Sequence, residues 1–452
     1  MMIRSPQNTS TLLVGLLGLA LSGLTGCGGI APTGPVRVTG AALHGTVHGG
    51  QNPVSGATIQ LYAAGSTGYG SAYPYASGTS LLGTHVVTSD GGGGFSISGD
   101  YTCPSATTPV YLVATQGNPG LSSGNNTNLA LMAALGPCGN LTTSTYISIN
   151  ELTTVASVWA LSPFMTSIAH IGTSATNVTG LSNAFAAVNK LVNTSTGTVS
   201  GPALPAGAIL PAAKIDTLAN VLAACVNSRG GTAGDSSPCG NLFSYTTVNN
   251  VAPTDTITAA MNMAQHPNTQ TSNLTYLVGS APPFQPTLST APNDFNLVIT
   301  YSGGGISTPK ALAADASGNV WTANSGSNSA TEIDALGVTT TDATGYLSGA
   351  SGYTVGSLNA PAAVAIDLSG NAWLTNAGNS TVTKISASGT TGTVFTGGNM
   401  STPSSLAIDA GGNIWIGNSG NASITGISST GVLTNYTGTL ISAPTAIAIN
   451  PK

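Results

Sequence analysis

The side chains that could act as nucleophiles, general acids or general bases are few in this chain, and few of them are grouped. Only 13 of the 452 residues are Asp or Glu, and only 5 are His. The string GLSSG at 120–124 matches the G-x-S-x-G pattern of a serine nucleophile, which needs a buried strand before it and a helix after it. The flanking residues, 116–119 and 125–126, are typical of loops instead. We therefore predict that Ser122 is not a nucleophile, and we assign no catalytic residue.

Two further candidates have a plain structural interpretation. Glu151 stands at the start of a predicted helix, where the helix dipole stabilises a carboxylate. His44 and His48 lie four residues apart on a predicted strand, so both side chains point to one face of the sheet without a third ligand nearby in sequence. The sequence therefore predicts no metal site and no cofactor from these residues.

The most regular polar side chains belong to a repeat in the last third of the chain. One Asp and one Trp recur in register in three successive copies: Asp315 and Trp321, Asp367 and Trp373, and Asp409 and Trp415. Each Asp precedes a Gly/Asn turn, and we expect it to accept hydrogen bonds from the N–H groups of that turn. A calcium site formed by Asp and Asn is the alternative. Each Trp is expected in the core between neighbouring copies.

The spacing of the copies predicts a β-propeller. Their leading prolines, Pro309, Pro361, Pro403 and Pro444, are 52, 42 and 41 residues apart, and the fourth copy stops where the sequence stops. Four short strands in about 40–45 residues are typical of a propeller blade, and the longer first interval indicates an insertion around 341–356.

The repeats are too few for an ordinary ring. Residues 297–452, with 297–301 as the entering strand, hold fewer than four such units, whereas propellers have roughly four to eight blades. We expect an incomplete propeller with uncovered blade faces. It would belong to a longer propeller protein or complete its ring with another chain, and its open edge would allow self-association.

The motif P-x-x-[IVL]-A-x-D-x-x-G-N-x-W resembles NHL-type repeats, and within them the propeller of the virginiamycin B (streptogramin) lyase family. That resemblance implies a metal held by His and Glu on one propeller face. All five histidines of this chain precede the propeller: His44, His48, His85, His170 and His266. Glu332 is the only Glu in the repeats. We therefore expect a propeller that binds an extracellular or periplasmic ligand or protein, with an enzyme of the lyase or hydrolase kind as the alternative.

The N-terminus predicts export. An apolar run at 11–24 follows Arg4 and is too short for a transmembrane helix, which needs about 20 residues. It ends in Leu-Thr-Gly-Cys at 24–27, which resembles a bacterial lipobox and so implies cleavage before Cys27 and lipid attachment to it. An ordinary signal peptide is the alternative. Gly28 after the cysteine implies, by the same resemblance, sorting to the outer membrane of the cell envelope.

Charge and cysteine content agree with that location. A net charge of −5 over the whole chain creates no field that would recruit nucleic acid. Apart from Cys27 there are four cysteines, which fall into two pairs close in sequence. We predict the disulfides Cys103–Cys138 and Cys225–Cys239, since disulfides persist in oxidising compartments. Metal binding is the alternative, but the CxxC spacing that favours it is absent from the sequence.

Two domains are predicted between the N-terminus and the propeller. Residues 36–149 resemble the carboxypeptidase regulatory-like β-sandwich through G-T-V-H-G-G at 45–50 and P-V-S-G-A-T-I-Q-L at 53–61, which implies a spacer. Helical spacing of apolar residues predicts a small α-domain at 150–280. The predicted fold is therefore a mainly β multidomain chain: signal peptide and lipobox 1–27, tether 28–35, β-sandwich 36–149, α-helical domain 150–280, Pro-rich linker 281–295 and partial NHL-type β-propeller 296–452.

Overall fold

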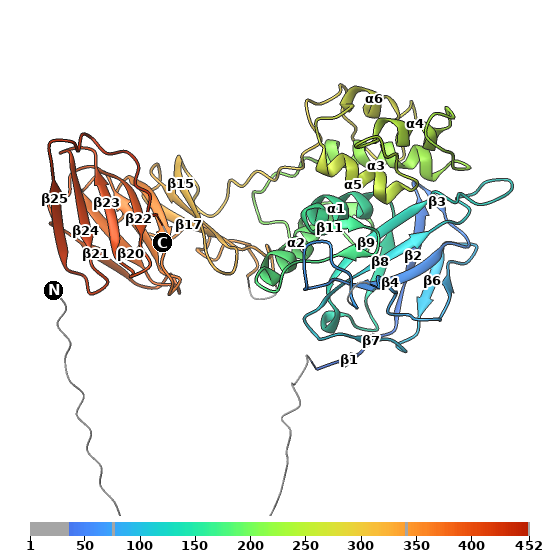
Figure 1. Ribbon diagram of the computed structural model, residues 1–452, viewed down its shortest axis with the longest axis horizontal. Coiled ribbons are helices and arrows are strands. Elements are labelled where there is room, and N and C mark those ends of the chain that lie inside the picture. Colours follow the sequence, from blue (N-terminus) through green and yellow to red (C-terminus); the bar gives the residue numbers. More distant parts are fainter. Residues whose placement is uncertain (1–35, 75–76, 340–341, 451–452) are drawn as a thin grey trace, which may run out of the picture. The chain divides into compact units, whose positions relative to one another are not determined.

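The computed structural model describes residues 36–74, 77–339 and 342–450 (Figure 1), and the elements named below belong to the compact unit Arg37–Lys452. The predicted signal peptide, with Cys27, lies outside the described residues. Among the residues that are described, no helix combines the length and the apolar character needed to cross a membrane.

Two four-stranded sheets form a β-sandwich in the first described part of the chain. The first sheet consists of β10 (Tyr146–Ile149), β2 (Leu43–Gly49), β3 (Asn52–Pro53) and β6 (Gly94–Ile97). The second runs in the order β5 (Val87–Thr88), β4 (Thr58–Ala63), β8 (Pro109–Thr115) and β9 (Ala130–Pro137). A two-stranded pair, β1 (Val38–Thr39) and β7 (Thr102–Cys103), lies beside them. β2 alternates between buried and more accessible residues because only one of its faces meets the core.

Six helices follow the sandwich in the described residues. They are α1 (Glu151–Leu161), α2 (Val178–Leu191), α3 (Ala212–Val226), α4 (Pro238–Tyr245), α5 (Thr256–Gln265) and α6 (Thr271–Tyr276). Short elements connect them: η1 (Cys138–Asn140), η2 (Ser162–Phe164), the pair β11 (Met165–Ser167) and β12 (His170–Ile171), and the pair β13 (Val192–Asn193) and β14 (Thr198–Val199). Asn150 begins α1 by accepting a hydrogen bond from the Thr153 N–H, and Asp255 caps α5 in the same way.

The helices pack against the second sheet and share a hydrophobic core with it. β8 and β9 are buried almost throughout because the first sheet covers one face and the helices cover the other. β9 is an edge strand of its sheet. Its N–H groups that no neighbouring strand engages donate hydrogen bonds to hydroxyl groups of α1 and α5, and the α5 contact is from Ala130 N–H to Thr256 at 3.0 Å. Met132 N–H binds Thr154 at 2.9 Å, and Ala134 N–H binds Ser157 at 3.0 Å. The edge is therefore closed to further strand pairing.

Both predicted disulfides are present. Cys103 joins Cys138 near the end of the sandwich, and Cys225 joins Cys239 between α3 and α4. Each bridge connects two segments that also pack together, so it reinforces an existing contact.

Three consecutive β-sheets form the C-terminal part of the described chain, as the repeat predicts. Blade 1 contains β15 (Pro309–Ala314), β16 (Val320–Asn324) and β17 (Ser329–Ile333). Blade 2 contains β18 (Pro361–Ile366), β19 (Ala372–Asn376), β20 (Thr381–Ile385) and β21 (Gly392–Phe395). Blade 3 contains β22 (Pro403–Ile408), β23 (Ile414–Asn418), β24 (Ser423–Ile427) and β25 (Leu433–Thr437). The first strands of successive blades lie side by side, and the described blades do not close a ring (Figure 1).

The prediction of an entering strand at 297–301 is wrong. This segment forms a single bridge, between Thr300 and Ile209, and no regular strand. Its would-be neighbours in a blade are absent from the described residues, so it has no ladder to join. The longer first interval does hold an insertion, which follows β17 and places Tyr346 opposite Ile333.

Candidate functional site

The recurring Asp residues organise the turns of the blades. Asp367 accepts hydrogen bonds from the N–H groups of Ser369 and Asn371, both at 2.9 Å, and from the Trp373 indole N–H at 2.9 Å. Asp409 makes the equivalent set, and hydrogen bonds from the Trp415 indole and the Asn413 amide lower its pKa to about 2. These carboxylates are therefore engaged by their own turns. Nowhere in the described residues do three His, Cys, Asp or Glu side chains gather as metal ligands.

Blade 1 departs from this pattern. Asp315 accepts hydrogen bonds from its turn, but the indole N–H of the buried Trp321 finds no partner among the described residues. Glu332, which stands opposite Trp321, accepts hydrogen bonds from the Tyr353 hydroxyl at 2.8 Å and from the Asn319 amide at 3.1 Å. Burial raises the pKa of Glu332. The sequence singled out Glu332 only as the one Glu of the repeats and did not predict this cluster.

One face of blade 1 carries mainly apolar side chains at positions that are buried or half-buried in the other two blades. We call it the blade-1 face, and it consists of Ile306, Pro309, Leu312, Val320, Thr322 and Ile333. The repeat places Leu312 in register with Val364 of blade 2. Leu312 is 67% exposed, whereas Val364 is 8% exposed because blade 1 covers it. The blade-1 face is thus constructed as a blade interface and has no blade against it in the described residues.

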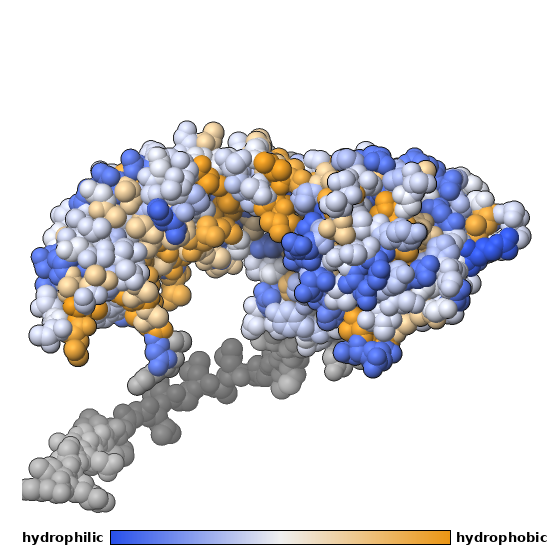
Figure 2. All heavy atoms as spheres, turned by 90° about the horizontal axis from the view of Figure 1, so that it is seen from above, coloured by the Kyte–Doolittle hydropathy of each residue, from blue (hydrophilic) through white to orange (hydrophobic). Residues whose placement is uncertain are grey.

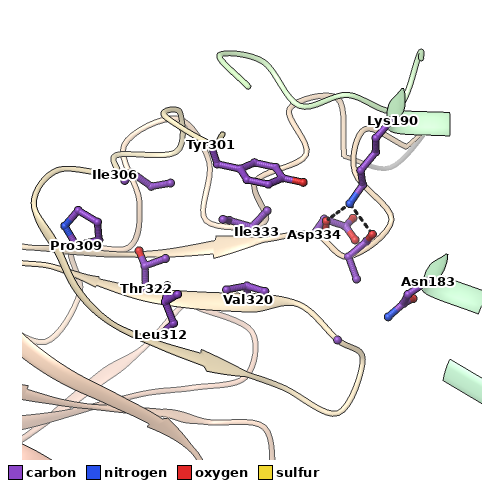
Figure 3. A pocket seen from close by; sticks show the side chains of 12 residues that line it. Asn183, Lys190, Tyr301, Ile306, Pro309, Leu312, Val320, Thr322, Ile333 and Asp334 are labelled. Carbon is purple, nitrogen blue, oxygen red and sulfur yellow. Dashed lines mark hydrogen bonds between the residues drawn. The ribbon is translucent and has the colours of Figure 1, made fainter. Parts of the chain in front are cut away.

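Helix α2 borders the blade-1 face and turns it into a cavity of about 430 Å³ (Figure 3). The Lys190 ammonium group donates hydrogen bonds to the carbonyl oxygens of Ala335 at 2.7 Å and Asp334 at 3.4 Å. Asn183 donates a hydrogen bond to the Ser317 carbonyl at 2.8 Å. Burial lowers the pKa of Lys190, and the nearby Asp334 charge opposes that shift. The rim of the cavity is therefore polar and its floor is apolar.

Tyr301 lies over this floor, above Ile333 (Figure 3). In the repeat it is in register with Tyr353 and Phe395. Those two rings stack on Trp321 and Trp373, with centroids 5.3 Å and 5.2 Å apart. Burial raises the pKa of Tyr301. The register of these aromatic residues was the signal in the sequence that could have identified the site.

Hydrophobic surface is concentrated in the same part of the molecule. Figure 2 shows apolar residues, in orange, gathered in patches over the blades, while the surface of the sandwich and helices carries more hydrophilic residues. Large contiguous patches of exposed apolar surface are typical of interaction sites.

The other sequence candidates lie apart from this cavity. Ser122 is in the loop between β8 and β9, where the Arg229 guanidinium contacts its hydroxyl at 3.5 Å. His44 packs edge-on against Tyr146, and burial lowers the pKa of His48.

Glu151 is fully buried, and both of its carboxylate oxygens accept a hydrogen bond from the Gly50 N–H, at 3.0 and 2.9 Å. Burial raises its pKa to about 7. This carboxyl group therefore fastens the β2–β3 turn to the start of α1, a role that the sequence did not predict.

Comparison with known proteins finds distant structural matches. No family model and no curated protein matches the chain. Among solved structures, a streptogramin B lyase matches at 18% identity with a TM-score of 0.27, covering 31% of this chain and 45% of that one. Virginiamycin B lyase from Staphylococcus aureus, in a catalytically inactive form with quinupristin, matches at 16% identity with a TM-score of 0.28, covering 34% and 50%. A nidogen/laminin complex matches at 17% identity with a TM-score of 0.25, covering 31% and 52%.

These matches span about half the length of each solved structure. At such identities and TM-scores they carry no argument about activity. The assignment of a mainly β, propeller-type chain therefore rests on the three blades themselves.

Proposed function

We propose that this chain is an exported, lipid-anchored protein of the bacterial cell envelope whose propeller binds an apolar ligand or protein segment and does not catalyse a reaction. The binding site is the blade-1 face together with the rim formed by Lys190 and Asn183. The observation that carries the proposal is the exposure of Leu312, whose equivalent in blade 2, Val364, is buried against blade 1.

The energetics of this face favour binding. Covering an exposed Leu side chain stabilises a complex by about 1.5–3 kcal/mol, and Val320 and Ile333 extend the same apolar floor. Ligand sites are typically apolar with a small number of polar groups that set orientation. Lys190 and Asp334 supply such groups at one end of the cavity.

The chemistry of the cavity argues against catalysis. A general acid or base needs a titratable group that is free to reach a substrate. The Lys190 ammonium is held by two backbone carbonyls, and Asp334 accepts a hydrogen bond from the Leu336 N–H. The recurring Asp carboxylates are likewise occupied by their turns. Binding therefore accounts for the site without a reaction.

Export and lipid attachment are supported by two features of the chain. The lipobox-like segment at 24–27 follows a signal-peptide core in the sequence. Two disulfides are also present, and disulfides are typical of proteins in oxidising compartments.

The binding proposal is tested with Nile red, a neutral apolar fluorophore, titrated into the mature protein. We expect saturable binding that Leu312→Asp weakens by about tenfold or more, because a carboxylate in an apolar floor must be desolvated when the probe binds. Leu368→Asp is the matched control, since Leu368 is 96% exposed in a turn of blade 2. Equal probe binding by both variants would overturn the assignment of the site.

A further inference from the structure

We propose that the partner of the blade-1 face is a three-stranded antiparallel β-unit of the same type of repeat, with a tryptophan at the register of Trp321. This inference rests on the proposed binding function and names the partner of that site.

The chain itself contains two copies of the interface that would form. Between blades 1 and 2, Trp321 and Ala330 pack against a cluster that contains Val364, Leu374 and Ile385. Between blades 2 and 3, Trp373 and Val382 occupy the same register and pack against Leu406, Ile416 and Ile427. Both interfaces therefore join a Trp-bearing face to the same set of apolar positions. The blade-1 face is the third instance of that set, with Leu312, Thr322 and Ile333 at the equivalent positions.

The segment that precedes blade 1 occupies the position that the fourth strand of a further blade, next to the blade-1 face, would have. The Thr331 hydroxyl donates to the Gly304 carbonyl at 2.6 Å. The Thr383 hydroxyl donates to Gly356 at 2.6 Å, and the Thr425 hydroxyl donates to Gly398 at 2.7 Å. These three hydrogen bonds are equivalent in the repeat. Gly304 therefore ends its segment in the same way as Gly356 and Gly398 end theirs.

Tyr301 indicates which side chain a partner would place beside that segment. Tyr353 and Phe395 each stack on the Trp of their own blade, which stands on the second strand. Tyr301 has the same register, but the described residues contain no Trp for it to stack on. The fitting partner therefore supplies the first three strands of a blade and its Trp, and leaves the fourth position to Tyr301.

The same geometry excludes an intact blade as the partner. Blade 3 of a second copy presents Trp415, but its own fourth strand places Tyr436 against that Trp at 5.5 Å. Tyr436 and Tyr301 would then compete for one position. A three-stranded unit avoids this conflict, and for this reason we favour it over head-to-tail association of two copies through complete blades.

The test uses a peptide spanning 361–391, which contains β18, β19 and β20 with Trp373. We expect the mature protein to bind it saturably by fluorescence anisotropy and the peptide to displace Nile red. Trp373→Ala in the peptide and Leu312→Asp in the protein should each weaken binding by about tenfold or more, which corresponds to about 1.4 kcal/mol. Leu368→Asp in the protein is the control that should leave binding unchanged.

A second arrangement covers the case in which the free peptide does not fold. The same 31-residue span, 361–391, is joined to the C-terminus of the full chain through a flexible Gly/Ser linker, which raises its effective concentration. The fusion should unfold at a higher temperature than an otherwise identical fusion with Ala in place of its Trp, and it should no longer bind Nile red.

The outcomes separate the two proposals. Nile red binding that depends on Leu312, without any effect of the peptide in either arrangement, would overturn the blade-type partner and leave the binding site standing. If Nile red binding does not depend on Leu312 and the peptide also has no effect, the binding site is overturned as well. Peptide binding that is insensitive to Leu312→Asp would show that the peptide attaches elsewhere and would also contradict the inference.

Discussion

At the scale of single residues, the carboxyl group of Glu151 is the clearest case in which burial changes chemistry. It has no cationic partner among the described residues, and its main compensation is the Gly50 N–H. Desolvation therefore outweighs hydrogen bonding, and its pKa rises from 4.5 to about 7.

This shift predicts that Glu151 makes folding less favourable as the pH rises. The folded state holds the proton more tightly than the unfolded chain, so the stability present below pH 4.5 is lost as the pH rises through 7. The loss amounts to about 3 kcal/mol. Glu151→Gln removes this titration. Between pH 4 and pH 8 the unfolding free energy of the unmodified protein should therefore fall, relative to that of the Gln variant, by about this amount.

The measurement is urea unfolding of both proteins at a series of pH values. Asp216 acts in the same direction because burial raises its pKa to about 6. The two proteins must therefore be compared at each pH, since Asp216 contributes equally to both. Parallel stability curves for the two proteins would contradict the assignment.

At the scale of elements, the blades share one turn design with a single exception among the described residues. In blades 2 and 3 the Asp of the first turn also holds the Trp indole, and in blade 1 it does not. The Asn319 amide donates hydrogen bonds to both Asp315 and Glu332. In blades 2 and 3 the equivalent amides of Asn371 and Asn413 donate to the Asp of their own turn.

The exception predicts unequal effects of one substitution in two blades. Trp373→Phe removes a hydrogen bond to a carboxylate and should cost about 1.5–3 kcal/mol beyond the packing loss. Trp321→Phe removes a donor that has no partner among the described residues, so it should cost the packing loss alone. Chemical unfolding of the two variants measures the difference, and equal destabilisation would argue that Trp321 is hydrogen-bonded in solution.

At the scale of the whole molecule, the chain combines a layered β/α unit with blades that present an uncovered face. The layered unit is closed at its β9 edge by helix hydroxyl groups and reinforced by two disulfides. The blades, in contrast, keep apolar side chains accessible at Leu312. This contrast supports the proposal that the propeller binds a ligand or protein segment and that the layered unit has a supporting role.

The proposed anchoring belongs to the same scale. In a bacterial host that processes lipoproteins, mass spectrometry of the mature N-terminus should find Cys27 as the first residue, carrying acyl chains. Cys27→Ser should release the protein from the membrane fraction, whereas the control Ser22→Ala should not. An unmodified Cys27, or cleavage at another position, would rule out the lipoprotein proposal.

Local patterns in the sequence determined the blades and the disulfide pairing. A strand needs alternation and a turn needs Gly or Asn, and both are properties of neighbouring residues, so the copies beginning at Pro361 and Pro403 could be delimited directly. The capping of α1 by Asn150 is equally local. The two cysteine pairs are close in sequence, which left few alternatives for their pairing.

Only the tertiary structure decided which faces are covered. The burial of Glu151 depends on Gly50, which lies 101 residues earlier in the chain, and no local pattern records that distance. The blade-1 face has nearly the same residue types as the faces of blades 2 and 3. Its exposure depends on the absence of a neighbouring blade among the described residues and on α2 lying at its rim. The proposed function therefore rests on an interface that is repeated in sequence but covered unequally in space.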